Sequence, residues 1–361
     1  MSVGTEETVA QDKLCARAEM AVYGVQVDAP VRRSKGAGPS DDGHLVVDGA
    51  NATLPIVADS PYQVRDGSVF RNGLDLGLSV EPVRRPRFYD LTTADGVPYQ
   101  QIALLHGKDV LATTVVQTCI RYDEPTRCRF CSIEESLRSG ATIAAKTPAQ
   151  LAEVAEAAVR LDGVTQMVMT TGTTTGLDRG ARNLVRSVRA VLEAVPGLPI
   201  QVQIEPPGDL SVISDLYAAG ATSIGIHVES LDDEVRRRWM PGKSTVPLAE
   251  YERAWDEAVR VFGRNRVSTY LLIGMGEDPD ELIAAAGRLI ERGVYPFVVP
   301  LRPMLGTLAR ADGVMAPDPR LVRDITARVA ALLAEADMRG ADQGAGCAAC
   351  GACSLLSAAG S

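Results

Sequence analysis

From about residue 110 onward, apolar runs of strand length alternate with amphipathic stretches of helical length. The apolar runs are Val110–Val116, Thr165–Met169, Ile200–Ile204, Ser223–Val228, Val267–Ile273 and Pro296–Leu301. The amphipathic stretches are Pro148–Leu161, Ala181–Val195, Ser211–Ala219, Leu248–Phe262, Pro279–Arg292 and Asp318–Ala336. This alternation predicts right-handed crossovers and a parallel sheet. Because a full barrel has eight such units, we expect an α/β fold with a partial (β/α)6 TIM-like barrel, and an open doubly wound sheet is the alternative.

The regions that flank this pattern differ from it. A helix over Thr8–Tyr23 and a loop at Arg33–Asp42 come before strand-like runs separated by turn signals. These runs are His44–Asp48, Thr53–Ala58, Ser68–Phe70 and Tyr99–Leu105. We expect residues 1–108 to form a β-rich extension, residues 109–338 the barrel, and residues 339–361 a Gly/Ala-rich tail that is flexible unless something ties it down.

Composition narrows the class of protein. The chain has 361 residues, 46% of them hydrophobic and 23% charged, which is typical of a soluble enzyme. A net charge of −9 argues against a nucleic-acid partner, because binding to phosphates needs clustered Lys and Arg. The sequence begins with a polar, acidic segment and contains no apolar run long enough for a membrane span. We expect a cytoplasmic protein without a membrane partner.

The predicted strands all lead into polar or glycine-containing segments. The six segments are Thr118–Ser132, Thr170–Gly176, Glu205–Pro207, His227–Ser230, Gly274–Glu277 and Arg302–Thr307. Because the carboxyl ends of parallel strands meet at one edge of a sheet, these segments are expected to lie together. A purely structural barrel would not need that arrangement, so the pattern favours an enzyme.

The first of these segments, TCIRYDEPTRCRFCS, carries Cys119, Cys128 and Cys131 in the spacing Cys-x8-Cys-x2-Cys. Thiolates are ligands of zinc and of iron–sulfur clusters. A zinc site would need a fourth ligand, for which His106 and Asp123 are candidates. A [4Fe–4S] cluster held by three thiolates would instead leave one iron open to another ligand.

The loop resembles the cluster-binding loop of the radical S-adenosylmethionine (SAM) superfamily, including the aromatic Phe130 before the last cysteine. The usual family spacing is Cys-x3-Cys-x2-Cys, so the first gap is longer here. The resemblance is to the biotin-synthase-like branch, and in particular to the radical SAM protein encoded beside a nitrilase in bacterial gene clusters linked to nitrile or cyanide use.

The resemblance also implies residues that contact SAM. The run from Thr170 to Thr173, which includes Thr171 and Gly172, occupies the position of a Gly-Gly-Glu motif that contacts the SAM amino group. Glu229 and Ser230 match ribose-binding positions, and Gly274 and Gly276 fall in the motif that contacts adenine, where Tyr270 replaces the usual first glycine. Arg302 matches a sixth-strand position. Glu205 is either a cofactor contact or a surface carboxylate.

If the resemblance holds, Cys119, Cys128 and Cys131 bind a [4Fe–4S] cluster whose fourth iron chelates SAM. Reductive cleavage of SAM then gives a 5′-deoxyadenosyl radical, which abstracts hydrogen from a small-molecule substrate, in nitrile or nitrogen metabolism. The partner implied is an electron donor such as flavodoxin or ferredoxin. The residues that act on the substrate are not identified by the sequence. The competing hypothesis is a zinc- or iron–sulfur-stabilised binding or scaffold protein without catalysis.

A second cysteine group closes the sequence. Cys347, Cys350 and Cys353 have the first spacings of a bacterial ferredoxin run but lack its fourth cysteine. An auxiliary iron–sulfur cluster, a zinc knuckle and an unliganded tail are the alternatives. Cys15 is either a fourth ligand or a buried structural thiol.

Overall fold

A seven-stranded sheet forms the centre of the computed structural model, which describes residues 3–27 and 43–359. The predicted loop at Arg33–Asp42 lies outside the described residues. In spatial order the strands are β13 (Val294–Pro300), β12 (Val267–Ile273), β11 (Ser223–Ile226), β10 (Ile200–Ile204), β9 (Gln166–Thr170), β8 (Val110–Thr114) and β7 (Leu104–His106). All neighbours are parallel except β7 and β8. Each predicted apolar run overlaps one of the six parallel strands, so the partial barrel is confirmed.

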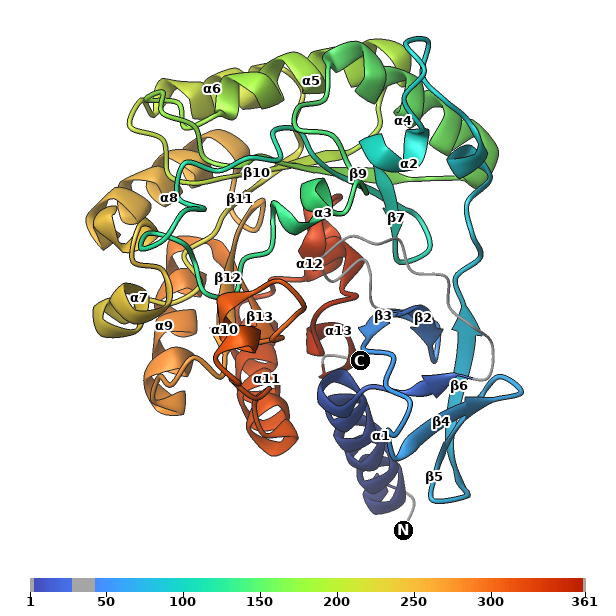
Figure 1. The fold of residues 1–361 in the computed structure, drawn as a ribbon. Coiled ribbons are helices and arrows are strands. Elements are labelled where there is room, and N and C mark those ends of the chain that lie inside the picture. The colour runs from blue at the N-terminus through green and yellow to red at the C-terminus, as the bar shows by residue number, and fades with distance from the viewer. Residues whose placement is uncertain (1–2, 28–42, 360–361) are drawn as a thin grey trace.

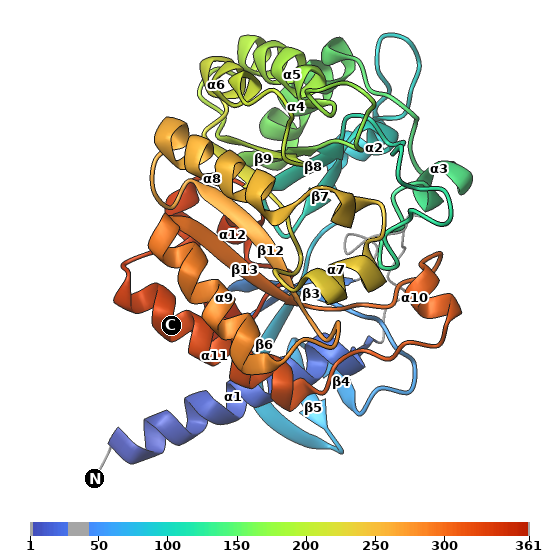
Figure 2. The same cartoon turned by 90° about the vertical axis from the view of Figure 1, so that its left-hand side faces the viewer.

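Helices cover the outer side of the curved sheet (Figure 1). They are α4 (Pro148–Asp162), α5 (Ala181–Ala194), α6 (Ser211–Ala218), α8 (Leu248–Phe262), α9 (Pro279–Arg292) and α11 (Pro319–Glu335). Several begin at side-chain caps that satisfy free backbone N–H groups, as Thr147 does for α4 and Asp278 for α9. A helix that the sequence did not predict, α7 (Asp233–Trp239), begins at Asp232 and lies near the strand ends in Figure 2.

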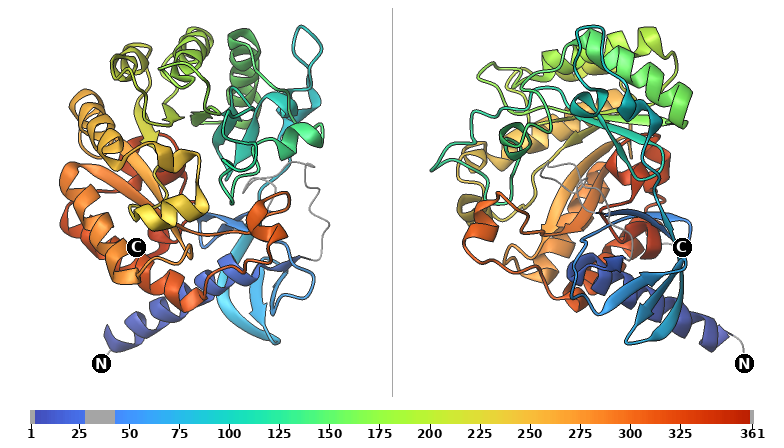
Figure 3. Two further views of the ribbon diagram at one scale, coloured as in Figure 1. Left: turned by 60° about the vertical axis from the view of Figure 1, so that its left-hand side comes forward. Right: turned by 45° about the vertical axis from the view of Figure 1, so that its right-hand side comes forward.

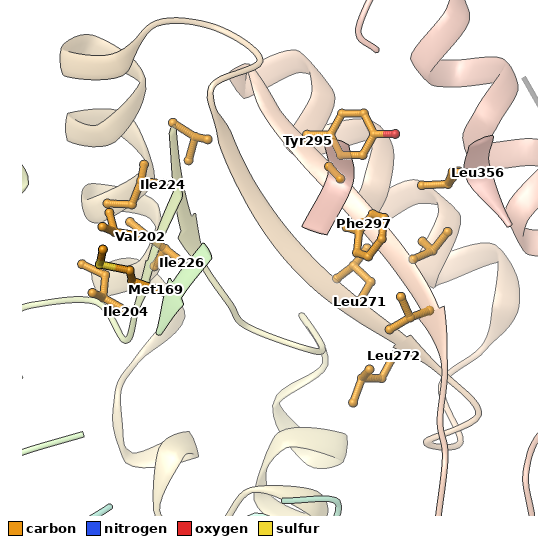
Figure 4. Close-up of a cluster of buried hydrophobic side chains, with 14 of the residues drawn as sticks. Met169, Val202, Ile204, Ile224, Ile226, Leu271, Leu272, Tyr295, Phe297 and Leu356 are labelled. Carbon is orange, nitrogen blue, oxygen red and sulfur yellow. The ribbon is translucent and has the colours of Figure 1, made fainter. Parts of the chain in front are cut away.

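The strands alternate between two environments. In β10 and β11 the apolar residues Val202, Ile204, Ile224 and Ile226 lie together in one buried cluster (Figure 4). The alternate positions of β10 carry Gln201 and Gln203, and period-2 geometry turns these toward the inner face. The part of the concave inner face that β10 forms therefore carries amides, and these take part in the contacts described below.

The N-terminal region forms a second, six-stranded sheet. Its order is β1 (Gln26–Val27), β4 (Tyr62–Arg65), β5 (Ser68–Arg71), β6 (Leu74–Pro82), β2 (Gly43–Val47) and β3 (Ala50–Leu54). Helix α1 (Val3–Tyr23) packs on α11. The expected strand Tyr99–Leu105 is wrong, because α2 (Tyr99–Ile102) occupies most of it before β7 begins. The predicted run Thr53–Ala58 likewise ends as a strand at Leu54.

The C-terminal segment lies on the inner side of the barrel, between the barrel and the N-terminal sheet (Figure 1). It contains η4 (Gly340–Gln343), α12 (Cys347–Cys350) and α13 (Leu356–Ala359). The inner-face amide of Gln201 donates to Gln343, and Ser223 donates to the Ala345 carbonyl. Ser354 donates to the carbonyl of Val298 in β13. These hydrogen bonds attach the C-terminal segment to the barrel, and the sequence pattern does not reveal them.

The open side of the arc, between β7 and β13, is bridged by β3 and the tail (Figure 3). The backbone N–H of Thr53 in β3 donates to Ala352 in the tail, and Arg302 after β13 donates to the Thr53 carbonyl at 2.7 Å. At the other end, the Lys108 N–H donates to Asn51. Among the described residues, no helix combines the length and apolar character needed to cross a bilayer.

Candidate active site

A pocket of about 210 Å³ lies at the carboxyl ends of the barrel strands. It is lined by all three cysteines of the first loop, by residues at or just after the ends of β9, β10 and β11, and by Lys243. They are Cys119, Arg121, Tyr122, Cys128, Phe130, Cys131, Ile133, Thr170, Thr171, Gly172, Thr173, Gln203, Ile204, Glu205, His227, Glu229 and Lys243. The expectation that polar strand ends meet in one place therefore holds for most of the segments.

The cysteine loop is held against the barrel by a buried ion pair. Arg121 donates to both carboxylate oxygens of Glu205, with Nη2–Oε1 at 2.7 Å and Nε–Oε2 at 3.1 Å. The Thr173 hydroxyl also donates to Glu205, at 2.6 Å, and Arg179 completes the group. A bidentate pair of this kind fixes orientation as well as charge. Glu205 thus lines the pocket while its carboxylate holds the loop in place.

Two further contacts tie the loop to its surroundings. Arg127 donates to the carbonyl of Cys131 at 2.9 Å and to the carbonyl of Gly306 in the loop after β13. The backbone N–H of Cys119 donates to Glu134 at 3.2 Å. The long gap between the first two cysteines therefore forms a folded structure with contacts on both sides of the pocket.

Gly172 allows the closest approach between the first loop and the segment after β9. Its N–H donates to the Val116 carbonyl at 2.8 Å. A Cβ at this position would stand 2.0 Å from the carbonyl oxygen of Thr118, the residue before Cys119. Because the atoms that this Cβ would meet belong to the backbone, no flexible side chain can move to relieve the overlap.

We expect Gly172→Ala to lower the free energy of unfolding by about 1–3 kcal/mol, because overpacking a tight contact costs that much. Gly287→Ala is the matched control, since Gly287 lies inside α9 and a Cβ there meets nothing closer than 3.9 Å. This control should be neutral or slightly stabilising. Equal stability of the two variants in chemical denaturation would contradict the close approach.

A second buried ion pair joins Glu229 to Lys243, whose Nζ lies 2.5 Å from the carboxylate. The side chains are only 9% and 14% exposed. Burial acts to lower the pKa of Lys243, but the charge and hydrogen bond of Glu229 together with the charges of Tyr251 and Cys128 outweigh it and raise the pKa, so the lysine stays charged. Glu229 adopts a left-handed backbone conformation, with φ of 62°, and its N–H donates to the Tyr270 carbonyl. This pair gives the pocket polar groups of both signs.

His227 lies in the pocket wall and stacks on Tyr270, with ring centroids 4.1 Å apart. Its Nδ1 accepts the backbone N–H of Tyr270, which leaves Nε2 without a partner among the described residues. Burial lowers the pKa of His227 to about 3, so the ring is neutral. The sequence pattern favoured a core histidine with all its hydrogen bonds made, whereas the structure leaves one ring nitrogen of this neutral, pocket-lining histidine without a partner among the described residues.

The three pocket cysteines fit an iron–sulfur cluster by the chemistry of their donor set. All are free thiols, and burial raises the pKa of Cys131 to about 11 and that of Cys128 well above its ordinary value. The charge of Cys131 also raises the pKa of Cys128, and the charge of Cys119 raises the pKa of both. Iron would supply the positive charge that buried thiolates need. Within the described parts of the chain, no three His, Cys, Asp or Glu side chains are close enough to hold a single metal ion.

The C-terminal cysteines lie against the inner face of β8 and β9, where Cys347 and Cys350 pack on Val110, Ala112 and Val168. Burial raises the pKa of Cys347 to about 11 and that of Cys350 to about 12. Gln203 donates to the Cys347 sulfur at 3.2 Å, and the Tyr270 hydroxyl also bonds to it. Asn51 of β3 donates to the Cys350 carbonyl. This second set of thiols is thus built into the barrel.

The structure does not bring every predicted residue to the pocket. Ser230 bonds to Glu277, and Gly274 packs against Pro317 instead. Gly276 packs against Arg238, and Arg302 lies with Cys353 in a separate hollow beside β3. The SAM contacts expected at Ser230, Gly274, Gly276 and Arg302 are therefore not among the lining residues. Cys15 lines neither of the pockets that contain the two cysteine groups. Its sulfur accepts a hydrogen bond from Arg323.

Sequence reasoning missed other residues that line the pocket, namely Arg121, Gln203 and Lys243. Gln203 carried a usable signal, because a polar residue at alternate positions of a barrel strand points inward. Arg121 lies inside the cysteine loop and Lys243 in a turn after α7, so only the folded chain shows their pairing with Glu205 and Glu229.

Comparison with known proteins shows what the central segment is similar to. Residues 125–289 match the family model described as "Radical SAM superfamily". The match includes Cys128, Cys131 and the pocket residues after β9, β10 and β11. Cys119 precedes the radical SAM match, and the fold brings it to the same pocket.

Curated relatives of the radical SAM segment are distant. Bacteriochlorophyllide c C-7(1)-hydroxylase of Chlorobaculum limnaeum is 24% identical over 63% of this chain and 60% of its own length. Lipoyl synthase of Chlorobaculum parvum is 28% identical over 46% of this chain and 54% of its own. The chain thus spans about half to three fifths of these relatives. A solved structure of methylornithine synthase aligns with a TM-score of 0.49 at 18% identity, covering 70% of each chain.

Radical SAM proteins use a [4Fe–4S] cluster together with SAM. The pocket fits this pair, because three half-buried thiols share it with the charged groups of Glu229 and Lys243 and with the neutral ring of His227. Cys119, Cys128 and Cys131 would hold the cluster. The remaining polar lining is available to SAM.

Proposed function

We propose that the protein is a radical SAM enzyme that acts on a small molecule. The observation that carries the proposal is that three half-buried thiols and the threonine segment after β9 line one pocket, most of which lies in the segment that matches the family model. When bound and reduced, the cluster and SAM supply a 5′-deoxyadenosyl radical that removes a hydrogen atom from a C–H bond of the substrate. The protein contributes positioning and shielding from water.

The chain's own residues divide this work. The Arg121–Glu205 pair holds the cysteine loop in place, and Gly172 lets the threonine segment pass close to it. Glu229 and Lys243 present opposite charges, which suits a ligand such as SAM that carries an ammonium, a carboxylate and a sulfonium. Polar strand-end groups at Thr170–Thr173 and His227 add hydrogen-bonding positions.

The test of this function is reductive cleavage of SAM. Protein reconstituted anaerobically with iron and sulfide should form 5′-deoxyadenosine when SAM and dithionite are added, and none should form without dithionite. Absence of 5′-deoxyadenosine with reductant would contradict the proposed function. Zinc without iron or sulfide in the purified protein would favour a structural metal site instead.

We further propose that Cys347, Cys350 and Cys353 hold a second iron–sulfur cluster. Their burial, their ferredoxin-like spacing and the bonds from Gln203 and Tyr270 to the Cys347 sulfur support this, since hydrogen bonds to sulfur are a common feature of such sites. Replacing all three with Ala should lower the iron content by about four atoms per chain if the cluster is [4Fe–4S], while the first cluster remains. An unchanged iron-to-protein ratio would contradict a second cluster.

The cellular setting proposed here rests on the sequence resemblance. We infer an electron donor such as flavodoxin or ferredoxin, a cytoplasmic location, and a substrate in nitrile or nitrogen metabolism. The likeness of the cysteine loop and tail to the nitrilase-linked radical SAM protein supports this setting. Reduction of the cluster by a flavodoxin or ferredoxin system in place of dithionite is the corresponding experiment.

A further inference from the structure

A second cavity, of about 380 Å³, lies next to the cysteine pocket. The two share Phe130, Cys131, Ile133, Thr170 and Gln203 as wall residues. Cys347 and Cys353 also line the larger cavity, so it extends from the cysteine loop to the C-terminal cysteines. Its size falls in the range of small-molecule sites. A molecule in this cavity would lie beside the proposed SAM site.

The ionisable side chains in the cavity wall are not balanced between cationic and anionic groups. Most of the lining is apolar or carries neutral amides and hydroxyls. Among the described residues that line it, Lys146 is the only Lys or Arg, and none is Asp or Glu. His106 also lines the cavity, but burial lowers its pKa to about 3 and keeps it neutral. Thiolates aside, the wall thus offers one cationic group and no carboxylate to pair with it.

Lys146 is buried, with only 6% of its surface exposed. Its Nζ donates to the carbonyl of Thr114 at 2.6 Å and to the side-chain oxygen of Gln117 at 3.1 Å. Both acceptors are neutral, and an ammonium group has three donors. Burial lowers the pKa of Lys146 to about 7 with no opposing acidic group. When it is charged, the lysine therefore has one donor left and no carboxylate of the protein to pair with it.

The backbone holds this side chain at the end of β8. The N–H of Lys146 donates to the Val115 carbonyl, and Thr147 starts α4 with a capping box. Gln117 in turn donates to the Ile133 carbonyl beside the cysteine loop, at 2.7 Å. A neutral side chain could bridge the same acceptors without burying an unpaired cation. The use of lysine here points to a ligand that brings the missing negative charge.

We propose that Lys146 binds a carboxylate group of the substrate and so orients the substrate in the cavity beside the SAM pocket. The inference rests on the proposed function and names its substrate class: a small organic acid whose remaining part fits an apolar and neutral polar wall. A carboxylate would receive the third donor of Lys146 in a charge-assisted hydrogen bond. Gln203 and Tyr270, which also line the cavity, would contact the rest of the molecule.

The experiment compares acids with their amides. Binding of butyrate, hexanoate and benzoate, and of butyramide, hexanamide and benzamide, is measured by saturation-transfer NMR on anaerobically reconstituted protein with SAM. At least one acid should bind roughly tenfold or more tightly than its amide. Lys146→Met should remove this preference and Lys146→Arg should keep part of it. Lys108→Met, at an exposed position after β7, is the control and should keep all of it.

Equal affinity for acid and amide, binding of none of the acids, or an unchanged preference in Lys146→Met would overturn the proposal. If Lys146 only braces the end of β8, the Met variant should melt at a lower temperature while the preference persists, which also counts against the proposal. Circular dichroism establishes that each variant folds. Formation of 5′-deoxyadenosine by the unaltered protein is measured separately. Its absence would overturn the proposed function, whereas the comparison of acids with amides still decides whether Lys146 binds a carboxylate.

Discussion

Replacement of Cys128 by Ala is expected to reduce 5′-deoxyadenosine formation to the level of a protein-free control. Cys128 lines the pocket between the cysteine loop and Lys243, and its pKa is raised by burial and by Cys131. With one of three thiolates gone, the cluster loses a ligand that no neighbouring group replaces, and about four iron atoms per chain should be lost. Iron and sulfide analysis of the reconstituted variant, beside the SAM-cleavage assay, measures both effects.

The matched control is Cys15→Ala. Cys15 lies in α1, where Arg323 of α11 donates to its sulfur at 3.2 Å, and it lines neither cysteine pocket. This variant should retain full iron content and SAM cleavage. If Cys128→Ala kept both properties as well, the assignment of the cysteine loop as the cluster site would be wrong.

The second large effect is expected from Lys243→Met. This change leaves Glu229 buried at 9% exposure without its cation. Breaking a buried ion pair from one side costs about 3–5 kcal/mol, because the remaining charge is desolvated and unpaired. We therefore expect a loss of this size in the free energy of unfolding, measured by urea denaturation, together with weaker SAM binding.

A double variant distinguishes the loss of the Glu229–Lys243 ion pair from the cost of leaving one of the two charges unpaired. Adding Glu229→Gln to Lys243→Met removes both charges and should recover much of the lost stability. Lys13→Met is the exposed control, because the Lys13–Asp48 pair has side chains 38% and 29% exposed and surface pairs contribute little. If Lys243→Met were no more destabilising than Lys13→Met, the buried pair would not have the role assigned to it.

The fold was largely predictable because its signals are local. The apolar runs and helical periods from Val110 onward describe single elements that bury one face, and parallel strands require helices between them. The meeting of Cys119, the Thr170–Thr173 segment and Glu229 follows from the same rule, since the carboxyl ends of parallel strands share an edge. For these residues, position along the chain was enough.

The remaining features depend on contacts between distant segments. The tail looked flexible because its composition is small and apolar, yet Gln201, Ser223 and Gln203 on the inner face bond to it. The motif position of Arg302 predicts a contact with SAM, whereas in the structure Arg302 donates to the Thr53 carbonyl in the N-terminal sheet. The sequence carries no signal for where that sheet packs against the barrel. The sequence does not distinguish Lys146 from other lysines, because its burial without an acidic partner is seen only in the folded chain.

The most direct test of the central claim is whether SAM binds to the cluster at Cys119, Cys128 and Cys131. Protein with the C-terminal cysteines replaced by Ala is reduced with dithionite and frozen with SAM labelled with ¹⁵N in its amino group and ¹⁷O in its carboxylate. Electron–nuclear double resonance of the reduced cluster should show coupling to both labels. A reduced cluster whose spectrum carries neither coupling at saturating SAM would contradict the account.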